Sequence, residues 1–115
     1  MPFDGRDVEM LAQARLRLAR DRIAGGLWVV GAIQRGEARC AVGWLGYYEE
    51  EHVPVYEAAL RRVWQSLPKS ARRPAGRLLP ISRMTNDVGR YNDHHTRKAV
   101  VRLFDRAIAA AEAQA

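Results

Sequence analysis

The sequence predicts an α+β domain that is predominantly α-helical, with four to five helices packed with a small β-hairpin. Apolar residues recur at helical spacing in several segments, which indicates amphipathic helices. A short β-branched run at residues 27–33 precedes a glycine-containing turn, which indicates one hairpin. The 115 residues, 48% of them hydrophobic, suit a single domain, 1–115, that buries a core without a disulfide or a metal.

The first helix is expected to begin near Asp4 or Asp7 and to end at Gly25 and Gly26. An aspartate accepts hydrogen bonds from the free N–H groups at a helix start, and glycine adopts the left-handed conformation that ends many helices. The arginines of this helix are interpreted as a solvated face with buried alkyl stems. Its predicted buried stripe consists of Val8, Leu11, Ala12, Leu16, Ala19 and Ile23.

Residues 27–33 are predicted to form a strand, 34–37 a turn and 38–40 the returning strand. Such a hairpin is marginal alone, so it must pack on helices. The apolar run at 41–48 contains Gly43 and Gly46. It is expected to form a short helix that approaches a neighbour closely at a glycine.

Residues 49–52, with the sequence EEEH, precede Pro54 and suit the first turn of the next helix. That helix is expected to end at Pro68. Its apolar positions are Tyr56, Ala59, Leu60, Val63, Trp64 and Leu67. Residues 68–80 contain three prolines and several cations, and are predicted to form a basic loop.

A short helix is expected from Ile81 to Gly89, followed by a polar corner. Asn92 and Asp93 would hold this corner through side-chain hydrogen bonds and leave His94 and His95 exposed. Thr96 is predicted to cap the last helix, whose alanine-rich end is expected to fray. Its core stripe is Val100, Leu103, Phe104, Ala107, Ile108 and Ala111.

The net charge of +6 is concentrated in residues 61–102, which hold eleven Lys or Arg against two acids. This asymmetry predicts an acidic partner for the segment, and the alternative is an ordinary solvated surface. The cations could neutralise phosphates, and Tyr91 could stack on a base, although no known nucleic-acid-binding motif accompanies them. The candidate binding residues are Arg72, Arg73, Arg77, Arg83, Arg90, Tyr91, Arg97 and Lys98.

Cys40 together with the histidines and Asn92 or Asp93 has the residue types of a cysteine nucleophile system. A lone cysteine in an apolar segment is more often a small buried hydrophobe. The spacings typical of metal ligands are missing. No catalytic residue, metal or cofactor is therefore predicted, and a Cys-dependent hydrolase is only the third alternative.

The sequence CAVGWL at 40–45 is similar to a CALGAL segment. YND at 91–93, followed by Thr96, Val100 and FDRAI at 104–108, is similar to a "WND…RT…V-L…FDRAI" ending. In these two segments the chain resembles a family of small uncharacterised proteins of actinobacteria and their phages. Tyr91 replaces the tryptophan of that pattern, and the corner is about two residues shorter. The resemblance implies a compact, mostly helical domain and no known activity.

The expected function is that of a small non-catalytic interaction protein that docks an Arg-rich face on a macromolecular partner with an acidic surface. By association with phages, an inhibitor type, anti-CRISPR-like included, fits this expectation. The alternative is nucleic-acid binding without strong sequence specificity. A cytoplasmic location, in the host cell if phage-encoded, is expected because the sequence has one cysteine, no signal peptide and no membrane-length apolar run.

Overall fold

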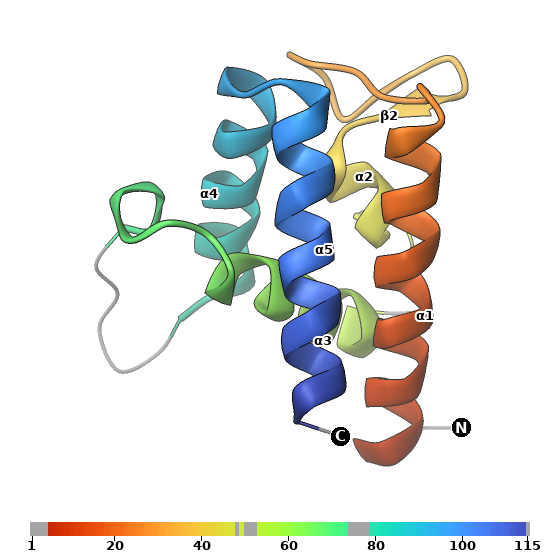
Figure 1. The fold of residues 1–115 in the computed structure, drawn as a ribbon, viewed down its shortest axis with the longest axis vertical. Helices are drawn as coiled ribbons and strands as arrows, with labels where there is room; N and C mark the ends of the chain where they lie inside the picture. Colours follow the sequence, from red (N-terminus) through yellow and green to blue (C-terminus); the bar gives the residue numbers. More distant parts are fainter. Residues whose placement is uncertain (1–4, 48, 50–52, 74–78, 115) are drawn as a thin grey trace.

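Five α-helices and one two-stranded hairpin make up the described part of the chain, residues 5–47, 49, 53–73 and 79–114 of a computed structural model (Figure 1). The elements are α1 (Gly5–Ala24), β1 (Gln34–Arg35), β2 (Ala38–Arg39), α2 (Ala41–Leu45), α3 (Val53–Gln65), the 3₁₀ helix η2 (Lys69–Ala71), α4 (Ile81–His94) and α5 (Arg97–Ala113). This composition confirms the predicted, mostly helical fold class. None of the described helices is both long and apolar enough to cross a lipid bilayer.

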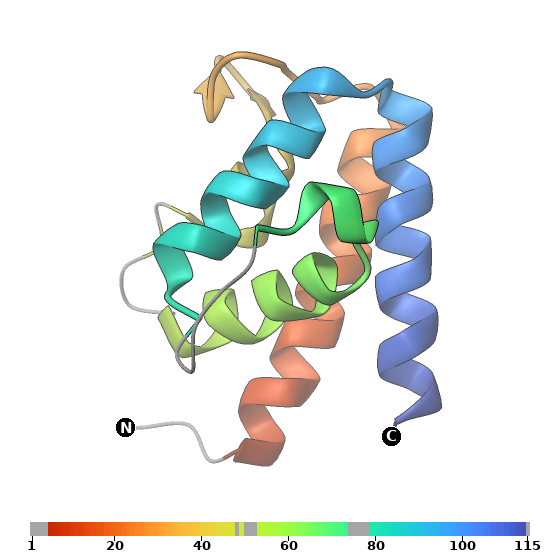
Figure 2. The same ribbon diagram turned by 90° about the vertical axis from the view of Figure 1, so that its left-hand side faces the viewer.

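The long helices α1 and α5 lie side by side and run in opposite directions (Figures 1 and 2). The helix α3 packs against both of them, and α4 packs on α3 and α2. The hairpin lies at the end of the molecule where α1 stops and α5 starts. The turn that joins α4 to α5 therefore sits beside the hairpin, at the same end.

The core consists of the apolar stripes that face inward from these helices. In α1 the predicted stripe is confirmed at Ala12, Leu16, Ala19 and Ile23, whereas Leu11 is exposed. In α5 the buried residues are Val100, Leu103, Phe104, Ala107 and Ala111, as expected from their spacing. The helix α3 also ends before Pro68, as predicted.

The prediction of a strand at residues 27–33 is wrong. The hairpin is shorter and lies later, with β1 inside the predicted turn and paired with β2 across residues 36 and 37. Residues 27–33 contribute one isolated bridge, between Trp28 and Arg39. Side chains and backbone both donate to their carbonyl groups. The indole of Trp44 donates to Leu27 and the amide of Asn92 to Val29, and the N–H groups of Arg39 and Cys40 donate to Leu27 and Ile33. The apolar run is thus a loop fixed by distant residues.

The prediction that the fourth helix ends at Gly89 is also wrong. The helix α4 continues to His94, and only His95 and Thr96 separate it from α5. An internal glycine weakens a helix by about 0.5–1 kcal/mol. Continuation past Gly89 buries Tyr91 and Asn92, which outweighs this cost. The predicted cap is confirmed, since the Thr96 hydroxyl accepts a hydrogen bond from the Ala99 N–H at 3.1 Å.

The close approach predicted for the glycines of α2 is confirmed at Gly43. A Cβ there would lie 2.6 Å from the Ile33 carbonyl oxygen. Gly46 ends this helix with a φ of 109°, in the left-handed region. The acidic residues 50 and 51 and His52 lie outside the described part of the chain, as does the section 74–78 of the predicted basic loop.

Candidate functional site

Asn92 is the polar centre that joins α4 to the loop 27–33. It is completely buried, and its Oδ1 accepts hydrogen bonds from the Trp28 indole at 2.6 Å and from the Ala41 N–H at 2.9 Å. Its amide donates to the Val29 carbonyl at 3.0 Å. Asp93 accepts from the Gly31 N–H at 3.0 Å. The expectation that these two residues hold a corner is therefore corrected, because they are helical and hold a loop some sixty residues earlier in the sequence.

Asp87 performs a similar task on another face of α4. Its carboxylate is buried, and Oδ2 accepts from the Trp64 indole at 2.9 Å and from the Arg73 N–H at 3.1 Å. The guanidinium of Arg72 lies over the Trp64 ring, 5.4 Å from its centre. These contacts attach the basic segment 69–73 to α4. The burial of Asp87 could not be predicted from the sequence, because nothing in the sequence distinguishes a buried aspartate in a polar helix from an exposed one.

Tyr91 and His95 form a stacked pair at the end of α4. Their ring centres are 3.7 Å apart with an interplanar angle of 14°. The backbone carbonyl of Tyr91 also lies 2.9 Å from His95 Nδ1, which fixes the imidazole further. Tyr91 is buried and stacks on His95, so little of its ring is open to a base. His95 is exposed and presents the planar ring at this position.

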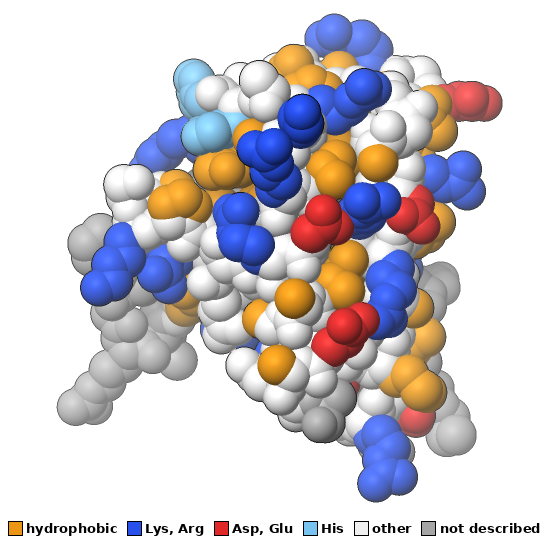
Figure 3. All heavy atoms as spheres, viewed as in Figure 1, with side chains coloured by type: hydrophobic (Ala, Val, Ile, Leu, Met, Phe, Trp, Pro, Cys, Tyr) orange, Lys and Arg blue, Asp and Glu red, His pale blue; other side chains and the backbone are white. Residues whose placement is uncertain are grey.

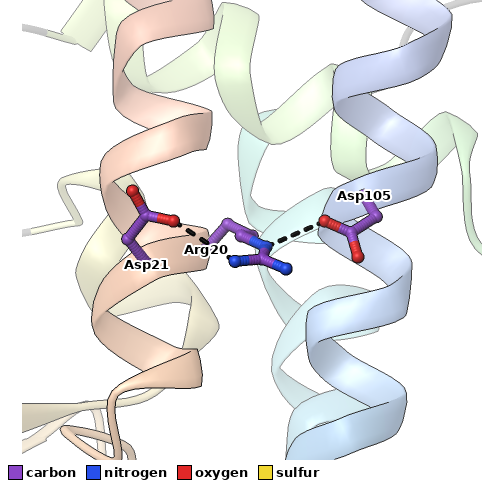
Figure 4. A network of polar contacts seen from close by, with 3 residues as sticks. All are labelled: Arg20, Asp21 and Asp105. Carbon is purple, nitrogen blue, oxygen red and sulfur yellow. Dashed lines mark hydrogen bonds and ion pairs between the residues drawn. The ribbon is translucent and has the colours of Figure 1, made fainter.

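The arginines of α1 and α3 differ from those near α4 in their partners. Arg15 pairs with Glu49 at 2.6 Å, Arg62 with Glu9 at 2.7 Å, and Arg17 with Glu112. Figure 4 shows Arg20 between Asp21 and Asp105, with 2.9 Å between Arg20 Nε and Asp105 Oδ1. The hydrogen bond and charge of Asp105 raise the pKa of Arg20. These four arginines therefore have carboxylate partners.

Six of the described cations around α4 have no such close partner. Among the described residues, no carboxylate lies within ion-pair distance of Lys69, Arg72, Arg90, Arg97 or Lys98, and Arg73 has only Asp87 at 3.8 Å. In the view of Figure 3, acidic side chains lie over α1 and α5, whereas the charged side chains visible on the side over α4 are basic, with His side chains beside them. We refer to these six residues as the cationic surface.

The predicted binding residues are thus partly brought together. Arg73, Arg90, Arg97 and Lys98 are exposed, Arg72 and Arg83 are half-buried, and Arg77 lies outside the described residues. Arg97 reaches the turn after α1, where a Cβ on Gly26 would lie 3.1 Å from its Nη1. The charge density along the sequence located this surface. Lys69 was not among the predicted residues. It joins the cationic surface because η2, in which it lies, sits beside α4.

Two hollows flank α4 and share Arg90 and His94. One, of about 310 Å³, lies between η2 and α4 and is also lined by Asp87, Tyr91 and His95. The other, of about 440 Å³, lies between α4 and the loop 27–33 and is also lined by Cys40 and Asp93. Within the described residues, no group of three or more His, Cys, Asp or Glu side chains is arranged to hold a metal ion.

Cys40, Asp93 and His94 therefore line one cavity, but Cys40 does not have the character of a nucleophile. The residue is 4% exposed, and burial raises the pKa of its thiol although the N–H groups of Gly43 and Val42 oppose the shift. A raised pKa means less thiolate at neutral pH, and the thiolate is the reactive form. The geometry thus favours a structural role for this cysteine.

We expect Cys40 in the folded protein to react with an aromatic disulfide reagent at least about tenfold more slowly than an unfolded cysteine at the same pH. Burial and the raised pKa both act in this direction. The measurement is the rate of thiolate release with and without guanidinium. Equal rates in the two conditions would contradict the assignment and revive the hydrolase alternative.

One family model matches residues 4–110 of the chain. The chain belongs to DUF6197, a family of unknown function. The expectation of an uncharacterised family is confirmed at this level. Comparison with curated proteins and with solved structures finds no significant match. Membership in DUF6197 leaves the function to be argued from the surface.

Proposed function

We propose that the protein is a non-catalytic interaction protein that binds an acidic macromolecular partner through the cationic surface. The observation that supports this most is the contrast in pairing. Nearby carboxylates neutralise four arginines of α1 and α3, namely Arg15, Arg17, Arg20 and Arg62. Within the described residues, no carboxylate pairs with Lys69 of η2, Arg90 of α4, or Arg97 and Lys98 at the start of α5. Like charges gathered without counter-charges repel each other, and an acidic partner relieves that repulsion.

The cationic surface is also built on fixed elements. Asp87 holds the segment with Arg72 and Arg73, and the cap at Thr96 fixes the start of α5 with Arg97 and Lys98. Charges held by a rigid frame lose little entropy when they bind, which favours a docking role. The proposal includes a role as an accessory or inhibitory protein of a phage or other mobile element. Only the family resemblance supports that role.

Two double variants with the same change in net charge test this proposal. Arg90→Ala with Lys98→Ala removes two unpaired cations, and Arg17→Ala with Arg20→Ala removes two paired ones. We expect the first pair to weaken binding to a short single-stranded DNA or to a polyglutamate peptide about tenfold at low salt, and the second to weaken it less than about twofold. Affinity is measured by fluorescence anisotropy across a salt series.

Two measurements distinguish a nucleic-acid partner from a protein partner: the salt series, and a pull-down from cell lysate with and without nuclease. For a nucleic acid, the slope of log affinity against log salt should fall by nearly two when two phosphate contacts are lost. A protein partner should be retained after nuclease treatment. If both double variants weaken binding equally, or if the wild type binds neither polyanion at low salt, the proposal is wrong.

A further inference from the structure

We propose that the hollow between η2 and α4 binds one nucleotide unit, a nucleobase that carries an exocyclic amine together with its phosphate. The inference rests on the proposed function and assigns the partner of the cationic surface to nucleotides, either free or within a single strand. The hollow, of about 310 Å³, lies at the lower end of the range of about 300–1,000 Å³ typical of small-ligand sites. Three features of its lining carry the argument.

The first feature is an acceptor without a donor. Asp87 lines the hollow with its side chain fully buried, and its Oδ2 takes both hydrogen bonds that the residue receives. Its Oδ1 has no hydrogen-bond partner among the described residues. The nearest cation, the Nε of the half-exposed Arg73, is 3.8 Å away, which is too far for a hydrogen bond. Because an unsatisfied buried carboxylate oxygen is costly, a ligand donor that displaces Arg73 would be favoured there.

The second feature is a planar ring held in a fixed orientation. His95 lines the same hollow, with one face of its imidazole stacked on Tyr91 and its Nδ1 at the Tyr91 carbonyl. The ring is nevertheless exposed, so it can accept a flat partner. Bases stack on aromatic and histidine side chains in many single-strand-binding proteins. A stacked base would lose little entropy here, because the ring does not need to be ordered.

The third feature is the mixture of charges around the hollow. Arg90 lines it, and Lys69 lies in η2, whose residues Ser70 and Ala71 form the opposite wall. A simple cation that sought Asp87 would meet repulsion from these groups, and a simple anion would meet repulsion from Asp87. A nucleotide with an amine on its base satisfies both, since the amine is a neutral donor and the phosphate is the anion.

The test is calorimetric titration of the wild-type protein with AMP and with IMP. The two nucleotides share the sugar, the phosphate and a purine ring. At position 6 adenine has an amine donor and hypoxanthine a carbonyl acceptor, and at position 1 adenine has an acceptor and hypoxanthine an N–H donor. We expect AMP to bind at least about tenfold more tightly, because its amine places a donor at Asp87 Oδ1 where IMP would place a carbonyl oxygen that the carboxylate repels. Oligomers of deoxyadenosine and deoxyinosine, used in the same way, show whether the unit is recognised within a strand or only free.

Three variants locate the site. His95→Ala should weaken AMP binding about fivefold or more through loss of stacking. Asp87→Asn should remove most of the preference for AMP over IMP, while circular dichroism and thermal melting confirm that the variant is folded. Arg106→Ala is the control, since Arg106 is an exposed cation of α5 that lines none of the described hollows, and it should leave both affinities within about twofold.

Failure of this inference is distinct from failure of the proposed function. If AMP and IMP bind equally, or if neither nucleotide nor either oligomer binds, the nucleotide site is wrong. Loss of affinity in the Arg90 and Lys98 double variant toward polyglutamate would in that case still support the cationic surface as a site for an acidic protein. Should Asp87→Asn unfold, the AMP and IMP comparison on the wild type decides the matter alone.

Discussion

Replacement of Asn92 by alanine is expected to lower the free energy of unfolding by about 3–4 kcal/mol. The side chain is completely buried and bonds three groups of the loop 27–33 and α2. Alanine would leave the Ala41 N–H and the Val29 carbonyl without partners in the interior, and each orphaned group costs about 1–3 kcal/mol. The Trp28 indole, which donates to Asn92 at 2.6 Å, would lose its acceptor as well.

Urea unfolding monitored by circular dichroism measures this loss. Asn86→Ala is the matched control, because Asn86 lies on the same helix with its side chain exposed, and it should change stability by less than about 0.5 kcal/mol. A drop of less than about 1 kcal/mol for Asn92→Ala would mean that water or a shifted loop replaces the lost bonds. The loop 27–33 would then not depend on α4 for its conformation.

The elements that the sequence predicted correctly are those fixed by nearby residues. The helix α1 follows from its apolar spacing and from the glycines after Ala24, and α5 follows from the cap at Thr96 and the stripe behind it. Both signals act within a few residues, so they can be recognised without knowing what packs against the helix.

The errors occurred where distant contacts overrule local preference. The run 27–33 has the composition of a strand, but the side chains of Asn92 and Trp44 donate to the carbonyls of Val29 and Leu27 within it. A glycine such as Gly89 commonly ends a helix, but burial of Asn92 one turn later favours a longer helix. The local sequence around 27–33 or around Gly89 does not indicate these contacts, because they join segments tens of positions apart.

The candidate site shows the same division. The excess of cations between residues 61 and 102 located the surface, since net charge is a property of composition. The side chains that organise it were not predicted. Asp87 gains its role from Trp64 and Arg73, which lie in other elements, and His95 replaces Tyr91 as the exposed ring only because the longer α4 stacks the two.

Replacement of Gly43 by alanine is expected to destabilise the fold by about 1–3 kcal/mol. The added Cβ would lie 2.6 Å from the Ile33 carbonyl oxygen and 3.0 Å from the Cβ of Arg39. The Ile33 carbonyl cannot move freely, because it accepts the Cys40 N–H at 3.0 Å next to the hairpin. Alanine would therefore separate α2 from the residues that precede β1, although it favours the helical conformation itself.

Gly89→Ala is the opposite case and serves as the control. Gly89 lies inside α4, and a Cβ there would lie 3.8 Å from Val42 Cγ2, an ordinary contact distance. The substitution should stabilise the protein by about 0.5–1 kcal/mol, since alanine loses less backbone entropy in a helix. Urea midpoints that shift in opposite directions for the two variants would establish that close approach, not helix propensity, requires glycine at position 43. A stabilising effect at both positions would show that the contact between Gly43 and Ile33 relaxes at little cost.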